Sequence, residues 1–501
     1  MKGRNSTLEN FDYDLQSLQE TRTIARQGKL AQAQLAKFSA EQIDQIIRNM
    51  VKAAEENAVS LAQMAVEETG FGKVEDKIFK NRFASTELYD FIKPMQTIGV
   101  INDDKVNKVM EIAEPVGLLM GIIPSTNPTS TTIYKSIIAI KSRNGIVFSP
   151  HPSALKCTLA AARLMNDAAV AAGAPANIIG CISKPSMQAT NELMKCDEVA
   201  MIIATGGSAM VKAAYSAGKP ALGVGPGNVP AFIERTADIR KAVKNIIASK
   251  TFDNGTICAS EQSVIVEESM RSQVMDEFRR QGGYFMSPEE TGKVAKLLFV
   301  RGHAMNAKMV GRSAAVIAEN AGITIPSGTK VLLGEQQGVG EGYPLSYEKL
   351  TTVLGFYTVK DWQEACDLSI KLLNNGGVGH SLSIHTENPE MAVRFAEKPV
   401  FRILVNTASS QGGVGASTGL APAFTLGCGT WGGSATSDNV TPMHLINKKR
   451  IAYGIKDVTE NQSSSPAACG AQSCGSSAVS DEQIMNVVNE VINLLKKRGD
   501  N

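Results

Sequence analysis

Short apolar runs alternate with alanine-rich helical segments over most of this chain, and this alternation constrains the fold more than any other feature. In the first half the runs lie at residues 117–123, 145–148 and 200–204, and residues 154–172 between them have a helical pattern. In the second half they lie at residues 263–266, 330–333 and 402–405. Continuous apolar strands separated by helices are typical of a parallel sheet covered on both faces. The sequence therefore predicts an α/β fold with two parallel-sheet lobes.

Composition excludes several classes of function. The chain has 501 residues and a formal net charge of +2, so it lacks the basic excess of a nucleic-acid or anionic-membrane binder. It contains no run of about 18 apolar residues, which argues against a membrane span. Its eight cysteines have no paired spacing and indicate reduced thiols in the cytoplasm. Cys469 and Cys474 are close in sequence but lack the further ligands of a zinc site, so no metal is expected.

The stretch 251–262 places one cysteine, Cys258, just after a glycine turn and among small residues. A buried cysteine is usually inert packing. Here a ligand could reach the sulfur, and a thiolate attacks a carbonyl carbon readily when a donor holds the resulting oxyanion. Asn127 follows an apolar run within a Pro-Ser-Thr-Asn-Pro turn and is the candidate for that donor. An Asn before Pro is otherwise an ordinary turn former.

A glycine-rich turn at residues 204–208 follows an expected strand and opens an expected helix at residues 209–217. Such a turn is suited to bind an anion, because backbone N–H groups at a helix N-terminus point outward. It does not match the G-x-G-x-x-G fingerprint of dinucleotide sites, so the signal is weak by itself. The glycine cluster at residues 223–228 is by itself more typical of a tight connection.

The amino-acid sequences of several segments resemble those of the CoA-dependent, acylating branch of the aldehyde dehydrogenase superfamily. This branch includes acetaldehyde and propionaldehyde dehydrogenases and the dehydrogenase half of bifunctional aldehyde–alcohol dehydrogenases. The resemblance covers about residues 15–455, and its most specific segments are residues 251–262, 402–413, 426–433 and 444–447. It implies two Rossmann-like lobes with the catalytic thiol in their cleft.

The resemblance also implies which residues of this chain have the catalytic and cofactor-binding roles of the family. Cys258 resembles the nucleophile, Asn127 the oxyanion donor and Glu348 the acid that binds the nicotinamide ribose. His380 fits the pattern of the branch and is a candidate neighbour of the active site. The cofactor-binding residues that the resemblance implies are Thr205, Gly206, Gly207, Ser149, His151, Pro124 and Gly225.

Two departures from the hydrolytic members of the superfamily are informative. Hydrolytic enzymes have an acid that activates the deacylating water, whereas the matching stretch here, residues 223–227, contains none. Without a base, attack by water loses a factor of about 10²–10⁴, and a CoA thiol needs that help less. We therefore expect transfer to CoA, with a hydrolytic enzyme that releases a free acid as the alternative. In the second departure, residues 149–154 lack the Lys and Glu that bind the adenosine ribose in hydrolytic relatives, which weakens the case for NAD over NADP. The resemblance implies NAD, and NADP is the alternative.

The last forty or so residues differ from the rest in composition and pattern. Residues 459–479 form a Ser/Ala/Gly-rich linker, and residues 480–498 have one broad apolar helical face followed by Lys496, Lys497 and Arg498. Such a helix either packs on its own subunit or docks in a partner's groove. It resembles the encapsulation helices of acylating aldehyde dehydrogenases in bacterial microcompartments. That resemblance implies a shell-protein partner, a location in the microcompartment lumen, and acetaldehyde or propionaldehyde as the substrate.

The expected organisation is a nucleotide-binding domain at residues 1–230 and a catalytic domain at residues 231–430. Residues 431–458 return to the cofactor lobe, and a β-arm at about residues 98–112 pairs with residues 450–453 across a subunit boundary, which gives a homodimer or homotetramer. Within the first domain, Ser39 and Gln42 form a capping box that begins a helix. A catalytically silent scaffold is the remaining alternative, and Cys258 and Asn127 argue against it.

Overall fold

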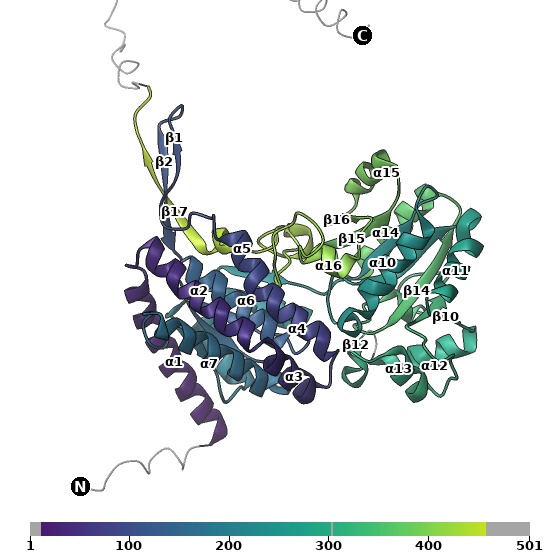
Figure 1. Ribbon diagram of the computed structural model, residues 1–501, viewed down its shortest axis with the longest axis horizontal. Coiled ribbons are helices and arrows are strands. Elements are labelled where there is room, and N and C mark those ends of the chain that lie inside the picture. Colours follow the sequence, from purple (N-terminus) through teal and green to yellow (C-terminus); the bar gives the residue numbers. More distant parts are fainter. Residues whose placement is uncertain (1–11, 302–303, 457–501) are drawn as a thin grey trace, which may run out of the picture. The chain divides into compact units, whose positions relative to one another are not determined.

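The computed structural model describes residues 12–301 and 304–456 (Figure 1). The chain begins with helices that account for most of its first 92 residues. Ser39 caps the helix Ala40–Glu56 through a capping box with Gln42, as predicted. A π-helical turn, Phe83–Glu87, separates two of these helices. The helices are α1 (Tyr13–Leu35), α2 (Ala40–Glu56), α3 (Ala58–Thr69), α4 (Val74–Arg82) and α5 (Leu88–Ile92).

The first lobe contains a five-stranded sheet in the order β5-β4-β3-β6-β7, and every pair of neighbours is parallel. Residues 124, 150, 206 and 225 follow the strands at one edge of this sheet, where ligands of open α/β sheets bind. The strands are β3 (Leu118–Ile122), β4 (Gly145–Ser149), β5 (Ile179–Cys181), β6 (Val199–Thr205) and β7 (Ala221–Val224). The helices are α6 (Pro128–Lys141), α7 (Leu155–Ala171), α8 (Met187–Lys195) and α9 (Ser208–Tyr215).

The second lobe contains a seven-stranded parallel sheet in the order β10-β13-β14-β9-β8-β15-β16. Its strands are β8 (Val229–Ile233), β9 (Glu261–Glu267), β10 (Gly283–Met286), β13 (Val331–Glu335), β14 (Val353–Val359), β15 (Gly379–His385) and β16 (Val400–Val405). Its helices are α10 (Ile239–Thr251), α11 (Arg271–Arg280), α12 (Pro288–Leu298), α13 (Ala314–Ala321), α14 (Trp362–Asn375), α15 (Pro389–Arg394) and α16 (Ser409–Gly413). A small ribbon pairs β11 (Phe299–Arg301) with β12 (Ala304–Met305).

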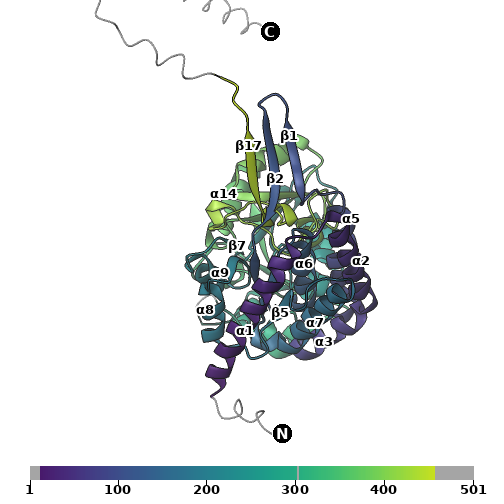
Figure 2. The same cartoon turned by 90° about the vertical axis from the view of Figure 1, so that its left-hand side faces the viewer.

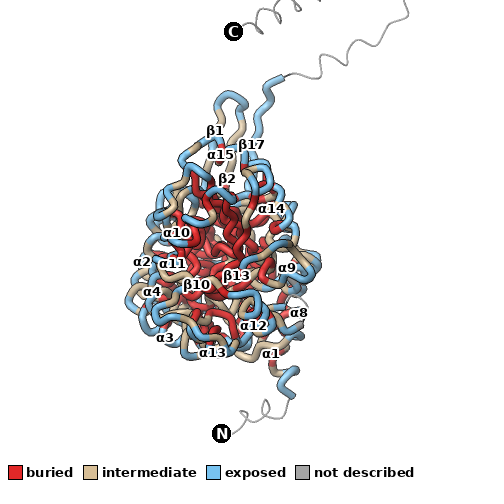
Figure 3. The backbone as a smooth tube through the Cα atoms, turned by 90° about the vertical axis from the view of Figure 1, so that its right-hand side faces the viewer, coloured by how far each residue is buried: buried red, intermediate tan, exposed pale blue. Residues whose placement is uncertain are grey.

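Both sheets are buried on both faces, which explains their continuous apolar strands. Every residue of β3, β4 and β9 is buried, and Figure 3 shows the buried backbone inside a layer of exposed helices and loops. The predicted α/β fold with two parallel-sheet lobes is therefore confirmed.

A separate antiparallel sheet has the order β1-β2-β17 (Figure 2). Its strands are β1 (Gly99–Asp104), β2 (Val109–Pro115) and β17 (Ile446–Ala452). Ion pairs join the two chain segments, with Lys448 and Arg450 on Glu111 at 3.2 Å each and Lys449 on Glu114 at 3.1 Å. Residues 105–108 and 452–456 belong to a second small unit, in which the Tyr453 N–H donates to the Lys108 carbonyl. The predicted linker and tail helix lie outside the described residues.

Candidate active site

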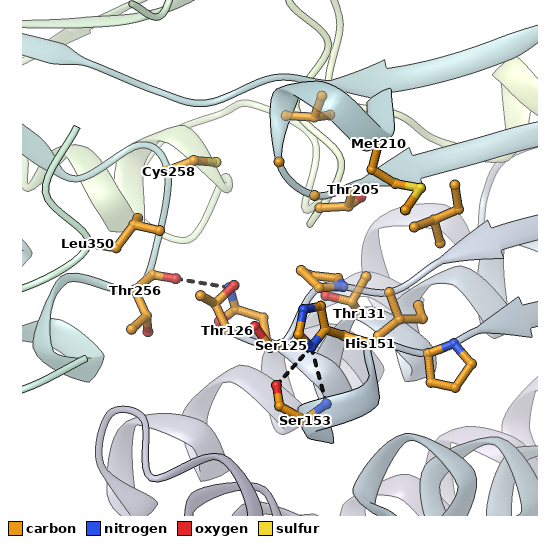
Figure 4. Close-up of a pocket in the computed structure, with 18 of the residues that line it drawn as sticks. Ser125, Thr126, Thr131, His151, Ser153, Thr205, Met210, Thr256, Cys258 and Leu350 are labelled. Carbon is orange, nitrogen blue, oxygen red and sulfur yellow. Dashed lines mark hydrogen bonds between the residues drawn. The ribbon is translucent and has the colours of Figure 1, made fainter. Parts of the chain in front are cut away.

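A cavity of about 580 Å³ opens where loops after strands of the first sheet meet the loop that carries Cys258 (Figure 4). In that view Cys258 and Leu350 lie on one side, and Thr205 and Met210 on another. The predicted site residues that line this cavity are Pro124, Asn127, Ser149, His151, Thr205, Gly206, Gly207, Gly225, Cys258 and Glu348.

Cys258 lies at the end of a tight turn between α10 and β9. The turn contains a short 3₁₀ helix, Phe252–Gly255, in which Asp253, Asn254 and Gly255 all have positive φ, at 48°, 52° and 78°. Two consecutive non-glycine residues in this region are uncommon and cost free energy that the surroundings must offset. At Gly255 a Cβ would overlap the Thr351 backbone. The sequence therefore folds here into a constrained loop that holds Cys258 at the cavity.

The Cys258 thiol is protonated near neutral pH in this environment. Burial, together with the charges of Glu348 and Cys428, raises its pKa to about 12, and the charge of Arg402 opposes this rise. Because the thiolate is the nucleophile, reaction at Cys258 requires a group that accepts the proton.

Glu348 is the only carboxyl group among the described residues that line the cavity. It follows a 3₁₀ turn, Pro344–Ser346, and its Oε1 accepts a hydrogen bond from the Gly227 N–H at 3.0 Å. Gly227 in turn packs against Cys258, because a Cβ at Gly227 would overlap the Cys258 carbonyl. Burial raises the pKa of Glu348 to about 7. A carboxyl that changes charge near neutral pH therefore lies beside the thiol.

This arrangement predicts faster alkylation of Cys258 in a Glu348→Gln variant. Above pH 7 Glu348 is a carboxylate, and its negative charge raises the thiol pKa. Removing that charge lowers the thiol pKa, so iodoacetamide should label Cys258 about three- to tenfold faster at pH 8. Below pH 6 the two proteins should react alike, since Glu348 is then neutral. Labelling of the Cys258 peptide is followed by mass spectrometry, with Glu341→Gln, an exposed glutamate, as the control. Equal or slower labelling in Glu348→Gln at pH 8 would contradict the assignment.

Asn127 occupies the N-cap position of α6, but its side chain does not cap that helix. Its Nδ2 donates to the Thr256 carbonyl at 2.9 Å and faces the Thr126 hydroxyl at 3.2 Å. Its Oδ1 accepts from the Lys80 ammonium at 2.6 Å. The amide N–H₂ of Asn127 therefore faces the loop of Cys258.

The turn Gly206–Gly207 leads from β6 into α9 and leaves open space at the cavity. A Cβ built at Gly206, Gly207 or Gly225 would meet no atom within 4 Å, and no side chain caps the N-terminus of α9. The lining contains no Lys or Arg among the described residues. An anionic group bound here would therefore be held by backbone N–H groups, and these residues fit the diphosphate of a dinucleotide.

Ser149 and His151 are held by neighbours within the same wall. The Ser149 hydroxyl lies 2.9 Å from the Thr190 hydroxyl. Nδ1 of His151 accepts from the Ser153 N–H at 3.2 Å, and burial lowers the pKa of His151, so this ring is neutral at pH 7. Neither an acid nor a cation therefore lies at this part of the lining.

His380 lies outside the cavity lining. It belongs to β15, is fully buried, and its Nδ1 lies 3.0 Å from the Ser381 hydroxyl. Burial and the charge of Arg402 lower its pKa to about 3. His380 therefore does not line the cavity itself, and its role as a neighbour of the active site stays a prediction.

Sequence reasoning missed a buried charged cluster behind Asn127, made of Lys77, Lys80 and Asp253. It also missed Thr131, whose buried hydroxyl lines the cavity and has no hydrogen-bond partner among the described residues. A signal existed for the cluster, because Lys77 and Lys80 lie three residues apart on one helix face and Asp253 lies in the same segment as Cys258.

Within residues 12–301 and 304–456, no group of three or more His, Cys, Asp and Glu side chains is arranged to hold a metal ion. No helix in the same ranges is both long and apolar enough to cross a bilayer.

Comparison with known proteins places the chain among aldehyde dehydrogenases. A model of the aldehyde dehydrogenase family matches residues 12–282. Over 439 residues the chain is 47% identical to the bifunctional aldehyde-alcohol dehydrogenase of Escherichia coli K12, an alignment that covers 86% of this chain and 49% of that protein. The chain thus spans about half the length of this curated relative.

Two solved structures are similar along nearly their whole length. An acetylating aldehyde dehydrogenase from Geobacillus thermoglucosidasius is 54% identical with a TM-score of 0.88, and the match covers 89% of this chain and 99% of that one. A propionaldehyde dehydrogenase from the fucose utilisation bacterial microcompartment of Clostridium phytofermentans is 28% identical with a TM-score of 0.78, covering 86% and 97%.

Proposed function

Because the chain belongs to the aldehyde dehydrogenase family, we propose that it oxidises a short-chain aldehyde to an acyl-CoA with NAD as the oxidant. The observation that carries this proposal is the placement of the Cys258 thiol, the Asn127 amide and the open glycine turn on one cavity. Similarity to an acetylating aldehyde dehydrogenase supports it.

The residues of this chain would carry the first step as follows. The Cys258 thiol loses its proton to a water molecule, and the thiolate sulfur forms a bond to the carbonyl carbon of the aldehyde. Because the pKa of the thiol is about 12, the thiolate is a minor species, and the step is favourable only as the carbon–sulfur bond forms. The Asn127 N–H₂ then donates to the developing oxyanion.

The residues that would hold the dinucleotide are Thr205, Gly206, Gly207 and Gly225, with Pro124, Ser149 and His151 on the adjoining wall. Bound there, a nicotinamide would supply the hydride acceptor, so that the group held on Cys258 could become a thioester. By the family resemblance, Glu348 would bind the nicotinamide ribose. We favour NAD over NADP because the described lining holds no Lys or Arg for a 2′-phosphate.

The acyl group on Cys258 then passes to a thiol or to water. The stretch 223–227 forms the end of β7 and the following turn and contains no acid. Glu348 is the one carboxyl of the described lining, and Gly227 already occupies one of its oxygens. Water therefore lacks a dedicated base, whereas the CoA thiol is partly thiolate near neutral pH and needs that help less. This argument favours transfer to CoA: the CoA thiolate forms the new carbon–sulfur bond, the bond to Cys258 breaks, and the Cys258 sulfur takes up a proton to replace the one that CoA lost.

NADH formation from propanal or acetaldehyde by the purified chain, with and without CoA, tests the proposal. We expect continuous turnover only with CoA. Continuous turnover without CoA would make the hydrolytic alternative correct.

The part of the lining that lies near Cys258 is mainly apolar, which supports a short alkyl aldehyde over a charged one. Its apolar side chains include Ile257, Val310, Leu350, Val414, Phe424 and Leu426.

For partners and location, we infer that the sheet β1-β2-β17 pairs between subunits and that the tail docks on a shell protein. Val100 and Ile451 are exposed on this sheet, and one solved relative is a microcompartment enzyme. A chain that ends at residue 458 should keep its catalytic rate and the native mass of a dimer or tetramer. It should lose association with purified microcompartment shells, and retained association would contradict the role of residues 480–498.

A further inference from the structure

A charged cluster lies directly behind Asn127 and is shielded from solvent. Lys77 and Lys80 from α4 are 2% and 1% exposed, and Asp253 from the turn before Cys258 is 0% exposed. Buried ion pairs cost desolvation free energy that their mutual attraction seldom exceeds. A cluster of two cations on one anion beside a reactive thiol therefore indicates a role besides stability.

The Lys80 ammonium joins the two loops that form the catalytic end of the cavity. It donates to Asn127 Oδ1 at 2.6 Å, to Asp253 Oδ2 at 2.5 Å and to the Thr256 hydroxyl at 3.3 Å. Burial lowers the pKa of Lys80 to about 8, while the Asp253 charge opposes this fall. The ammonium has three protons, so these contacts use all of them.

These contacts determine which way the Asn127 amide points. An ammonium only donates hydrogen bonds, so the amide atom that faces Lys80 must be the oxygen. The N–H₂ group is thereby directed to the Thr256 carbonyl and the Cys258 loop. A charged donor on the oxygen also draws electron density from the nitrogen, which makes its N–H a stronger donor.

We propose that Lys80 is a positioning residue for the oxyanion donor: it holds the Asn127 amide with its N–H₂ toward the loop that carries Cys258 and strengthens that donor. This inference rests on the proposed function, in which Asn127 stabilises the oxyanion. It adds a residue from the N-terminal helices to the machinery that accelerates thioester formation.

Lys77 provides a matched comparison within the same cluster. Its ammonium also donates to Asp253 Oδ2, at 2.9 Å, but its other contact is the Thr126 backbone carbonyl at 2.9 Å. Removing either lysine therefore weakens the tether on Asp253, whereas only removal of Lys80 releases the Asn127 amide.

The test compares Lys80→Met with Lys77→Met in single-turnover NADH formation from propanal and NAD without CoA. Loss of one oxyanion donor costs about 10²–10³ in rate, so loss of its support should slow Lys80→Met by about 10- to 100-fold. The single-turnover rate of Lys77→Met should stay within about threefold of the parent rate, and KM for propanal should change little in either variant. In an Asn127→Ala background, Lys80→Met should lower the rate by less than about a further twofold, since the two changes remove the same contribution.

A spectroscopic readout separates positioning from folding. In the acyl-enzyme, the thioester carbonyl stretch should move to higher frequency in Lys80→Met and in Asn127→Ala, but not in Lys77→Met, because its hydrogen bond is weakened. If Lys80→Met does not fold, Lys80→Gln takes its place, because it removes the ammonium and leaves Asp253 paired with Lys77.

The outcomes distinguish this inference from its premise. A normal rate in Asn127→Ala would overturn the role of Asn127 and with it this part of the proposed function. A slow Asn127→Ala with a normal Lys80→Met, or equal slowing by Lys77→Met and Lys80→Met, would overturn the inference alone.

Discussion

Replacing Cys258 with alanine is expected to reduce NADH formation by at least about 10⁴-fold, because removal of a covalent nucleophile leaves only binding and polarisation by the remaining site. No other thiol can take its place, since the described cavity lining contains no second cysteine. Steady-state NADH formation with propanal, NAD and CoA is the measurement.

Cys428→Ala is the matched control for this prediction. Cys428 is a second buried thiol that influences the pKa of Cys258, yet it lies outside the cavity lining. Its thiol lies 3.6 Å from the Leu426 carbonyl, and alanine keeps the Cβ against which Gly432 packs. Activity within about threefold of the parent is expected, as for a change that touches no reacting atom. Substantial activity in Cys258→Ala, or its loss in Cys428→Ala, would mean that the nucleophile was assigned to the wrong thiol.

Omitting CoA should lower the steady rate by about 10²–10⁴-fold, the contribution that a positioned general base would otherwise make to attack by water. Before that limit is reached, each Cys258 should produce one NADH, so a burst with an amplitude of one per active site should precede the slow phase. Stopped-flow absorbance at 340 nm resolves the two phases, and mass spectrometry should find the propionyl group on Cys258.

Glu348→Gln serves as the internal check on this result. If the chain turned over continuously without CoA and lost that turnover in Glu348→Gln, Glu348 would be the base that the stretch 223–227 lacks. That pair of results would assign the hydrolytic reaction and reject acyl transfer to CoA. A slow phase that is unchanged by Glu348→Gln is the outcome expected of an acylating enzyme.

The fold could be predicted because local patterns carry most of its information. The apolar runs at residues 117–123, 145–148 and 402–405 correspond to β3, β4 and β16 of the parallel sheets, of which β3 and β4 are fully buried and β16 is an edge strand. The order of the strands could not be predicted, since pairing such as that of β14 with β9 depends on contacts between distant segments. The expected domain boundaries remain predictions.

For the site, sequence reasoning found the residues that follow parallel strands, such as Pro124, Thr205 and Gly225, because strand ends converge at one sheet edge. It did not find Lys80, whose position depends on how α4 packs against the turn before Cys258. Burial also changes chemical character in ways that sequence does not reveal. His380 fits a motif, yet the structure places it in a strand outside the cavity lining with a pKa of about 3.

The ion pairs between α4 and Asp253 limit how far the two lobes can move apart beside Cys258. They tie the helical layer of the first lobe to the segment that leads into the second sheet, and a contact of the Lys73 N–H with Asp253 Oδ1 at 2.8 Å reinforces them. Parting the lobes at this edge would leave charges in a partly dehydrated crevice, at a cost of several kcal/mol. The ion pairs therefore favour a fixed position of the Cys258 loop relative to the Asn127 loop, and the thiol and the proposed oxyanion donor keep their spacing.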